Sequence, residues 1–383
     1  MDVTNTANKR IKEGYDILNR LSQIRIDGVP KLRNKIKQEI NFLEKCTKTQ
    51  IIKEEHLVCS NLIHLEALSS KLIKLQNVCN AVMSNKTLSF EDGYSRKICI
   101  DLVLHGGSVW MKVIARNQKA ITIISNGEGS YKQKSILDQA AEFVECSKQN
   151  ILYYKPPNVV FFFANGVDNC VAKDLSKVGI KVESNDSGGD ENICSRNAPD
   201  ILDYPIKDLE IVRNLAVIRS MPHLKLNLGV TTLIACASAL TNGGCHYSFK
   251  SDILQKHAEW ERARPVKPIL DCLFEGRQLY CCKSAAKIFQ NILDTLGGET
   301  EKERGENILK QCTIVEDRPT DKLKILGKIK ERSLAIFGTG ESLQAVTVTA
   351  NHAFIRSAMN QGINFSVFLH EARALTERKQ LPI

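Results

Sequence analysis

Two short stretches of the sequence combine glycines with polar side chains that could contact a ligand. In the first, the apolar residue Leu228 is followed by Gly229, Val230 and two threonines. In the second, residues 338–341, two glycines flank a threonine and precede a carboxylate. Ligands of open parallel sheets lie beyond the carboxyl ends of the strands, beside helix N-termini. Both stretches are therefore candidate binding sites if each one links a strand to a helix.

Glu341 is the candidate catalytic residue of the second stretch. Carboxylates hold hard cations such as Mg²⁺ or Mn²⁺, which lower the pKa of bound water and neutralise a phosphate during hydrolysis. A carboxylate in the first turn of a helix is also favoured by capping and by the helix dipole, so a structural role explains Glu341 as well. Other residues are expected to line the same site. They are Gly229, Thr231, Thr232, Thr339, Thr347, Asn351 and Asp294.

A second set of candidate residues lies in the middle of the chain. Asp101 and Lys112 fall on two successive β-rich segments, and Gln139 falls in the helical segment that follows. This order is similar to restriction-endonuclease-like folds, whose core runs hairpin, helix, strand. Such an active site has a second acid two residues before the lysine, and that position is Trp110 here. The resemblance therefore implies the topology with an incomplete acidic site.

Residues 1–90 are predicted to form a helical region that begins with a hairpin of amphipathic helices. Apolar residues recur at steps of three or four in residues 32–43 and again in residues 62–75. Gly28 and Pro30 interrupt the pattern between two helices. The region holds 15 Lys and Arg against 9 Asp and Glu. This basic surface could contact RNA or a protein partner, although a solvated helix face explains it too.

Residues 91–200 are predicted to form a middle αβ domain. Alternating β-branched and aromatic residues predict a hairpin of strands 98–104 and 109–115 around a turn at 105–108. A strand at 121–124, a helix at 135–146, a strand at 159–164, a helix at 170–178 and a strand at 180–183 are expected to follow. Small polar residues at 185–190 and the segment 200–205 predict a linker.

Residues 201–383 alternate strands with helices, which predicts a three-layer α/β domain with a mostly parallel sheet. The expected strands are 226–230, 313–315, 333–336 and 365–369. The expected helices are 251–262, 266–274, 284–293, 299–311 and 341–361. In this arrangement each glycine-containing stretch lies at the carboxyl end of a strand, and Thr347 and Asn351 share one face of the last helix.

Composition places the chain among globular intracellular proteins. Its 383 residues carry a net charge of +10, a moderate basic excess that permits nucleic-acid binding without requiring it. The 13 cysteines show no C-x-x-C pair and no zinc-ligand spacing, so reduced, buried thiols are expected. A signal peptide or membrane span is not expected, which favours the cytoplasm or nucleus. His223, His246, His352 and His370 are expected at the surface or in the core rather than as ligands.

Four longer strings carry a resemblance to a family. They are L-N-L-G-V-T-T-L-I at 226–234, L-T-N-G-G-C-H at 240–246, I-L-D-T-L-G-G at 292–298 and F-G-T-G-E-S-L-Q-A-V-T-V-T-A-N at 337–351. With these strings the chain resembles an uncharacterised eukaryotic family of the UPF type that has a C-terminal domain of unknown function. Their layout is similar to that of PIN-type nucleases. In these enzymes one acid ends the first strand, a second lies in a middle helix and a third begins a late helix, and together they hold Mg²⁺ or Mn²⁺.

The sequence departs from that acidic pattern at two of its three positions. Gly229 stands at the end of the first strand and Ile288 stands in the middle helix. Of the three acidic positions, the one that keeps a carboxylate is Glu341. The resemblance therefore implies a degenerate PIN-like domain in a binding or scaffold protein that associates with RNA. The alternative is an active ribonuclease that uses Mg²⁺ or Mn²⁺ with Glu341 and further carboxylates such as Asp294 or Asp317. Two or more carboxylates within about 5 Å of Glu341 would favour the enzyme.

Overall fold

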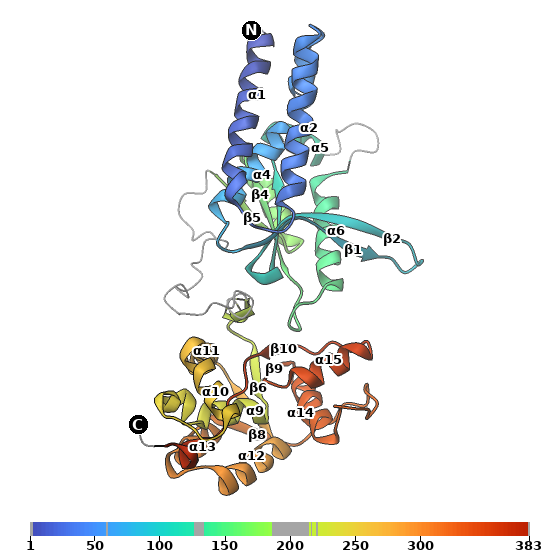
Figure 1. Cartoon of the computed structure of the whole chain (residues 1–383). Coiled ribbons are helices and arrows are strands. Elements are labelled where there is room, and N and C mark those ends of the chain that lie inside the picture. The colour runs from blue at the N-terminus through green and yellow to red at the C-terminus, as the bar shows by residue number, and fades with distance from the viewer. Residues whose placement is uncertain are drawn as a thin grey trace. The chain divides into compact units, whose positions relative to one another are not determined.

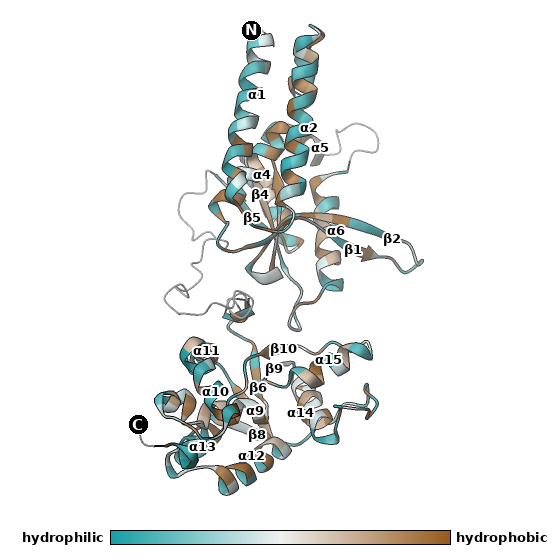
Figure 2. Ribbon diagram, in the orientation of Figure 1, coloured by the Kyte–Doolittle hydropathy of each residue, from teal (hydrophilic) through white to brown (hydrophobic). Residues whose placement is uncertain are grey.

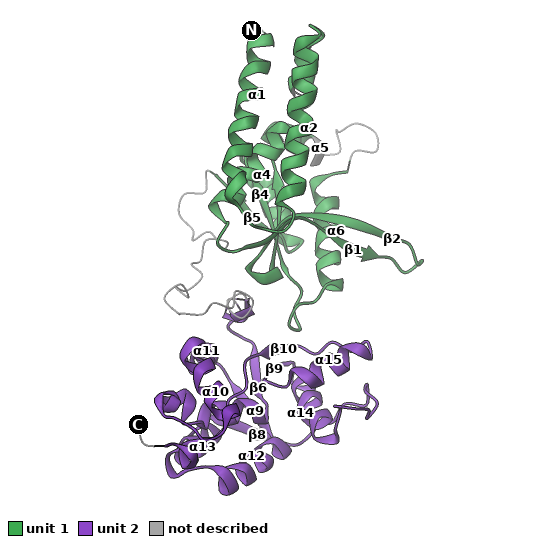
Figure 3. Cartoon of the chain, in the orientation of Figure 1, with its two compact units in different colours: residues 1–198 green, residues 199–383 purple. Residues whose placement is uncertain are grey.

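The computed structural model describes residues 3–58, 60–125, 134–185, 214–215, 217–219 and 221–381. The chain divides into two compact units, Met1–Ala198 and Pro199–Ile383 (Figure 3). Each unit is a mixed α/β structure around a five-stranded sheet (Figure 1). Apart from Asn185, the linker segments expected at 185–190 and 200–205 lie outside the described residues. No helix in the described ranges is both long and apolar enough to cross a bilayer.

Unit 1 begins with the predicted helices, and α1 and α2 run side by side (Figure 1). The helices are α1 (Val3–Arg20), α2 (Val29–Lys48), the short α3 (Glu54–Val58) and α4 (Leu62–Lys74). The predicted break at Gly28 is confirmed. Gly28 has φ +82°, and a Cβ there would lie 1.8 Å from the carbonyl oxygen of Val82, so only glycine fits. The apolar side of α2 shares one core with the sheet of the same unit.

The sheet of unit 1 has the order β1-β2-β3-β4-β5. The strands are β1 (Cys79–Ser89), β2 (Ser95–Leu104), β3 (Val109–Ile114), β4 (Asn158–Phe163) and β5 (Lys181–Ser184). The predicted hairpin of β2 and β3 is confirmed, and β1 extends it into an antiparallel meander. β3, β4 and β5 run parallel to one another. β4 is strongly hydrophobic (Figure 2), and alternate residues of β2, β3 and β4 contribute to two separate cores.

Three helices connect the parallel strands of unit 1. They are α5 (Gln118–Ser125), α6 (Ile136–Gln149) and α7 (Asn169–Lys177). The predicted helices at 135–146 and 170–178 are thus confirmed, and Ser135 begins α6 with a capping box that includes Asp138. The strand expected at 121–124 is wrong because these residues belong to α5. Ile121 is buried and Ile123 is exposed, as one side of an amphipathic helix requires.

The sheet of unit 2 is parallel, as predicted, with the order β10-β9-β6-β7-β8. The strands are β6 (Lys225–Leu228), β7 (Leu279–Cys282), β8 (Cys312–Val315), β9 (Ala345–Thr349) and β10 (Val367–Leu369). The helices are α9 (Val230–Ala237), α10 (Asp252–Ala263), α11 (Lys267–Phe274), α12 (Lys283–Leu296), α13 (Glu299–Gln311), α14 (Glu331–Ser342) and α15 (His352–Asn360). The strand order reverses between β6 and β9, which makes their carboxyl ends a topological switch point.

The largest error of the sequence interpretation lies in residues 331–361. The strand expected at 333–336 is part of helix α14, and the helix expected at 341–361 is divided into strand β9 and helix α15. Residues 333–340 are all buried, so their side chains show no amphipathic period from which a helix could be recognised. Val346, Thr347, Val348 and Thr349 form a run of β-branched residues, which favours the strand that the structure contains.

The two glycines of this stretch serve close packing rather than a turn. Gly338 and Gly340 lie inside α14. A Cβ at Gly338 would lie 2.4 Å from the carbonyl oxygen of Arg318 and 2.4 Å from the amide nitrogen of Thr320. A Cβ at Gly340 would clash with the Thr347 hydroxyl and lie 2.9 Å from the Asn227 amide nitrogen. The missing side chains therefore let α14 approach a loop and the sheet.

Candidate functional site

The carboxyl ends of β6 and β9 bring together four of the predicted site residues, Gly229, Thr231, Thr232 and Asn351. Gly229 precedes α9, and its N–H donates to the carbonyl of Val348 at 3.0 Å. The Thr231 hydroxyl lies 3.1 Å from that of Thr349 and accepts the N–H of Ala350 at 2.8 Å. Asn351 caps α15 by accepting the N–H of Phe354 at 3.1 Å. These polar groups therefore hold the switch point together.

His370 completes this switch-point cluster, and sequence reasoning did not assign it to the site. Its Nε2 lies 2.8 Å from the hydroxyl of Thr232, and its Nδ1 lies 2.8 Å from the carbonyl oxygen of Glu371. The Thr232 hydroxyl oxygen also lies 2.7 Å from the carbonyl oxygen of Val348. Burial lowers the pKa of His370 to about 4, so the ring is neutral at pH 7. Both ring nitrogens are already engaged inside the protein.

Glu341 does not lie at this edge of the sheet. It is in the last turn of α14, just before β9 begins, so it is near the amino end of that strand rather than the carboxyl end. Its carboxylate accepts a hydrogen bond from the Lys322 ammonium at 2.7 Å. The expectation that Glu341 opens a helix at a strand end is wrong. Thr339, on the same helix, is fully buried and accepts the N–H of Arg318 at 2.9 Å.

The remaining predicted residues of unit 2 are dispersed. Thr347 lies within β9, and its hydroxyl accepts the side-chain amide of Asn227 at 3.1 Å. It does not share a helix face with Asn351. Asp294 is exposed on α12, about 16 Å along the helix axis from the end of β7. Ile288 lies in the same helix, six residues closer to β7 than Asp294.

Asp317 is the one predicted acid that follows a strand, two residues after β8. Its carboxylate accepts the N–H of Ser284 at 3.0 Å and also bonds the hydroxyl of that serine. Burial acts to raise the pKa of Asp317, but the hydrogen bonds from Ser284 and Cys282 and the charge of Lys283 together outweigh it and lower the pKa. Asp317 therefore caps the start of α12, where a carboxylate also suits the helix dipole.

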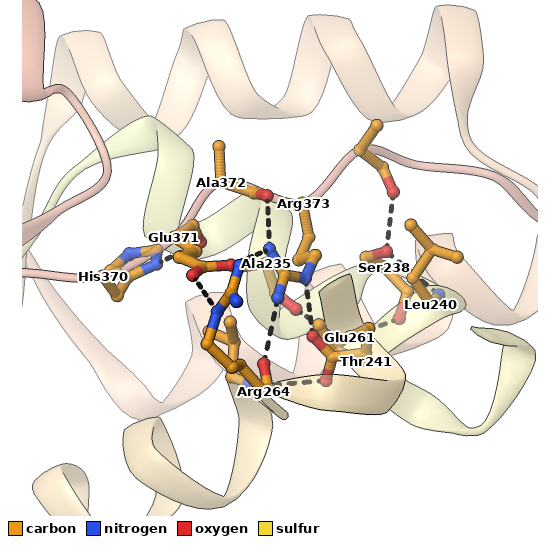
Figure 4. Close-up of polar contacts among 12 residues, drawn as sticks. Ala235, Ser238, Leu240, Thr241, Glu261, Arg264, His370, Glu371, Ala372 and Arg373 are labelled. Carbon is orange, nitrogen blue, oxygen red and sulfur yellow. Dashed lines mark hydrogen bonds and ion pairs between the residues drawn. The ribbon is translucent and has the colours of Figure 1, made fainter. Parts of the chain in front are cut away.

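Beyond β10, a partly buried network of ion pairs holds the segment that follows the sheet (Figure 4). The Arg373 side chain is fully buried and donates to Glu261 at 2.6 Å and to Glu371 at 3.0 Å. It also donates to the carbonyl of Arg264 at 3.0 Å, and Arg264 pairs with Glu371 at 2.5 Å. Each carboxylate of this network thus has a guanidinium partner.

The described residues of both units lack a cluster that could hold a metal ion. Across the described part of the chain, no three His, Cys, Asp or Glu side chains gather closely enough to coordinate one. The described cysteines are free thiols, and most of them are buried. Burial raises the pKa of Cys236 and Cys312 to about 12, so these thiols stay protonated at neutral pH.

Unit 1 brings the other predicted set of residues together. Asp101 on β2 is 2% exposed, and its carboxylate lies 3.1 Å from the ammonium of Lys112 on β3. The same carboxylate accepts the N–H of Val113 at 2.9 Å. Trp110, which occupies the position of a second acid, is buried in the core. The predicted cross-strand pair is therefore present as an ion pair with a single carboxylate.

Lys112 and Gln139 line one cavity of about 980 Å³, near the upper end of the usual size of ligand sites. The cavity lies at the carboxyl ends of β3 and β4, where Ala115 and Asn165 follow the strands. Its polar side chains are Ser60, Asn61, His64, Lys112, Arg116, Asn117, Gln139 and Asn165. Its apolar side includes Ile63, Ile114, Ile121 and Ile136.

The charge in this cavity is positive. Lys112 and Arg116 line it, and no Asp or Glu is among its described lining residues. Burial lowers the pKa of His64; Asp101 acts against this shift, while Lys112 and Lys35 add to it. At one end, Ser60 and Asn61 donate to Glu39 at 3.0 and 3.1 Å. The cavity therefore offers cations, amides and an apolar wall to a ligand.

Comparison with known proteins assigns both units to families without an assigned activity. The model of a family of unknown function, DUF5614, matches residues 1–193. The model of a protein of unknown function, DUF1308, matches residues 226–382. No solved structure matches the chain. The expected domain of unknown function at the C-terminus is confirmed, and the function has to be argued from the residues themselves.

Proposed function

The chain belongs to the DUF5614 family of unknown function, and we propose that it is a binding or scaffold protein that contacts RNA without cleaving it. Under this proposal both units are nuclease-like folds whose metal sites have degenerated. Unit 2 would be the PIN-like domain, and unit 1 would have the restriction-endonuclease-like topology. In both units, positions where a metal site would need acids hold other residues, and this supports the proposal.

The ion pair of Asp101 and Lys112 carries the proposal. A two-acid metal site holds its cation between carboxylates, because hard cations need several oxygen ligands. Here the ammonium of Lys112 lies 3.1 Å from the single carboxylate, and Trp110 takes the place of the other acid. The lysine thus neutralises Asp101 in the way that a metal ion would. A fixed cation of this kind can hold a phosphate but cannot activate water as a metal does.

Unit 2 supports the proposal in the same way. Gly229 follows the first strand of its sheet, and Asn351 rather than an acid begins the helix after β9. An added Cβ at Gly229 would lie 3.2 Å from the Val348 carbonyl oxygen and 3.3 Å from the Thr349 hydroxyl. A side chain at this position would therefore crowd the Val348 carbonyl and the Thr349 hydroxyl. The parallel sheet and its strand-end loops support a nuclease-like ancestry, and these contacts favour a non-catalytic edge.

The first test is metal binding followed by thermal unfolding. A ligand that binds only the folded state at 100 times its Kd stabilises it by about 2.7 kcal/mol. We expect no shift in Tm with millimolar Mg²⁺ or Mn²⁺, and no cleavage of a single-stranded RNA under the same conditions. The same RNA should bind the full chain in a gel-shift experiment.

The alternative, an active ribonuclease with Mg²⁺ or Mn²⁺ as cofactor, predicts the opposite result. It requires a saturable rise in Tm together with cleavage that disappears in Glu341→Gln or in Asp101→Asn. These two variants separate the units, because each one removes the candidate acid of one unit only. If the purified chain cleaves the RNA and either variant does not, the proposal of a non-catalytic protein is wrong.

A further inference from the structure

We infer that the cavity of unit 1 is a phosphate site, in which Lys112, Arg116 and His64 hold the phosphate ester of an RNA strand or of a free nucleotide. This inference rests on the proposed function, since it takes the pair of Asp101 and Lys112 as a fixed cation. It goes further by naming the site and the chemical group that the site binds.

The charges around the cavity favour an anion. Lys112 and Arg116 line it, and among the described residues Asp101 on β2 is the one carboxylate that pairs with Lys112. Lys35 is close enough to His64 to lower its pKa further. Like charges held together in one cavity repel, and a phosphate relieves that repulsion while it forms charge-assisted hydrogen bonds. Guanidinium and ammonium groups are the side chains that proteins use for this purpose.

Several donors of the cavity have no partner among the residues that the structure describes. The side chains of His64, Arg116 and Gln139 form no hydrogen bond or ion pair with any residue in the described structure. Lys112 has three N–H donors, of which Asp101 takes one, and its side chain is 23% exposed. Asn165, by contrast, already donates to the carbonyl of Ala115 at 2.8 Å. Lys112 and Arg116 are the cations among these donors, and a phosphate would lie beside them.

Asp101 positions the lysine. Its carboxylate is fixed on the sheet by the N–H of Val113 at 2.9 Å and holds the Lys112 ammonium at 3.1 Å. A lysine held by one contact loses less side-chain entropy on binding a second partner than a free lysine does. Asp101 is therefore a positioning residue for Lys112 rather than a ligand for the phosphate.

The rest of the lining suits the remainder of a nucleotide. Ile63, Ile114, Ile121 and Ile136 provide an apolar wall beside the cations. Asn61, Asn117 and Gln139 carry amides, which can both donate to and accept from a base or a ribose. About 980 Å³ accommodates a nucleotide. A phosphate with an attached base would thus use both sides of the cavity.

The decisive experiment measures binding of a fluorescein-labelled single-stranded RNA of about 12 nucleotides, a length within the usual range of such sites, to the full chain by fluorescence anisotropy. We expect Arg116→Gln to weaken binding about tenfold, since one charge-assisted contact is lost. The matched control is Lys119→Gln, which removes the same charge from an exposed neighbour outside the cavity and should change Kd less than twofold. The double variant Asp101→Asn with Lys112→Gln removes the fixed cation without leaving a buried charge, and should also weaken binding.

Competition identifies the source of the phosphate. If a nucleoside 5′-monophosphate displaces the RNA, and Arg116→Gln weakens the nucleotide as well, the site binds single nucleotides. If only RNA binds and Arg116→Gln weakens it, the site binds the phosphodiester of a strand. If inorganic phosphate binds but neither the RNA nor the nucleoside 5′-monophosphate does, the nucleotide part of the inference is wrong.

Two outcomes separate this inference from the proposed function. If RNA binds and is not cleaved, but Arg116→Gln and Lys119→Gln bind alike, then the phosphate site is wrong and the proposed function stands. If metal-dependent cleavage appears while Arg116→Gln still weakens binding, then the site stands and the non-catalytic proposal is wrong. A chain that binds none of the three ligands overturns the phosphate site.

Discussion

The cavity of unit 1 and the switch point of unit 2 are both polar, but they differ in what their side chains already contact. At the switch point, Thr232 and His370 bond each other and nearby backbone carbonyls. In the cavity, His64, Arg116 and Gln139 have no such partner in the described structure. Ligand binding requires donors and acceptors that the fold has left unused. The number of polar residues alone does not identify a site.

The buried ion pairs of the two units show the same difference. Arg373 is fully buried between Glu261 and Glu371, whereas Lys112 reaches the cavity and is 23% exposed. A charge that is wholly buried has to be neutralised for the unit to fold, and this makes its pair part of the scaffold. In an ion pair with one side chain at the surface of a cavity, that side chain can also bind a ligand. We therefore regard Arg373 as structural and Lys112 as a binding residue.

The largest expected effect comes from replacing Arg373 and Lys112, the basic partners of the two ion pairs, in separate variants. Arg373→Met leaves Glu261 and Glu371 without their buried partner and should lower the free energy of unfolding of unit 2 by about 4 kcal/mol. Lys112→Met should lower that of unit 1 by about 2 kcal/mol, because water in the cavity can solvate Asp101 and the N–H of Val113 remains.

Urea denaturation can follow the units separately, since each has one tryptophan, Trp110 in unit 1 and Trp260 in unit 2. The fluorescence of Trp260 in a Trp110→Phe background reports on unit 2, and that of Trp110 in Trp260→Phe reports on unit 1. Equal losses in the two variants would contradict the distinction between a scaffold pair and a cavity pair.

A smaller effect is expected from pH, through His370. Its pKa of about 4 in the folded state lies below the ordinary value of 6.5. Above pH 6.5 the ring is neutral in both states and contributes no pH dependence. As pH falls from 6.5 to 4, only the unfolded chain takes up this proton, so stability should fall by about 3 kcal/mol in total. Below pH 4 this contribution is constant.

The measurement is the free energy of unfolding of unit 2 between pH 7 and pH 5, above the range in which most carboxylates titrate. His370→Asn should reduce the slope, although the variant is less stable throughout. The slope that remains belongs to His257, whose pKa burial also lowers. His246→Asn, at an exposed position, is the matched control and should leave the slope unchanged. An undiminished slope in His370→Asn would show that the switch-point cluster does not depend on a neutral ring.

Much of the fold could be predicted from the sequence because its periodic signals are local. The apolar steps of α2 and α4, the alternation in β2 and β3, and the break at Gly28 each specify an element from neighbouring residues alone. β1 and β7 were not predicted. β7 is a four-residue strand of the sequence L-Y-C-C, whose partners are far away in the chain. Such a strand depends on the sheet around it rather than on its own residues.

The candidate sites were predictable to different degrees for a related reason. Asp101 and Lys112 lie on adjacent strands of a hairpin, so their contact follows from local sequence. The position of Glu341 depended on whether residues 333–336 form a strand, and complete burial of α14 removed the amphipathic signal. His370 meets Thr232 only after the whole sheet has formed, across 138 residues of sequence. Contacts of that kind follow from topology, which periodicity does not specify.

The smallest effect we expect concerns the glycines of α14, and it tests whether this stretch of unit 2 is a packing element rather than a ligand loop. Gly338→Ala would place a Cβ against the backbone of Arg318 and Thr320, which cannot move without shifting the loop, so stability should fall by about 2 kcal/mol. Gly305→Ala in α13 is the matched control. Its Cβ would meet the side-chain ends of Leu293 and Phe289, which can rotate away, and alanine also favours a helix by about 1 kcal/mol. The loss at Gly305 should therefore be smaller when urea unfolding is followed by the fluorescence of Trp260. If Gly338→Ala is neutral, the loop is not held against α14, and residues 338–341 could then adopt another arrangement around a ligand.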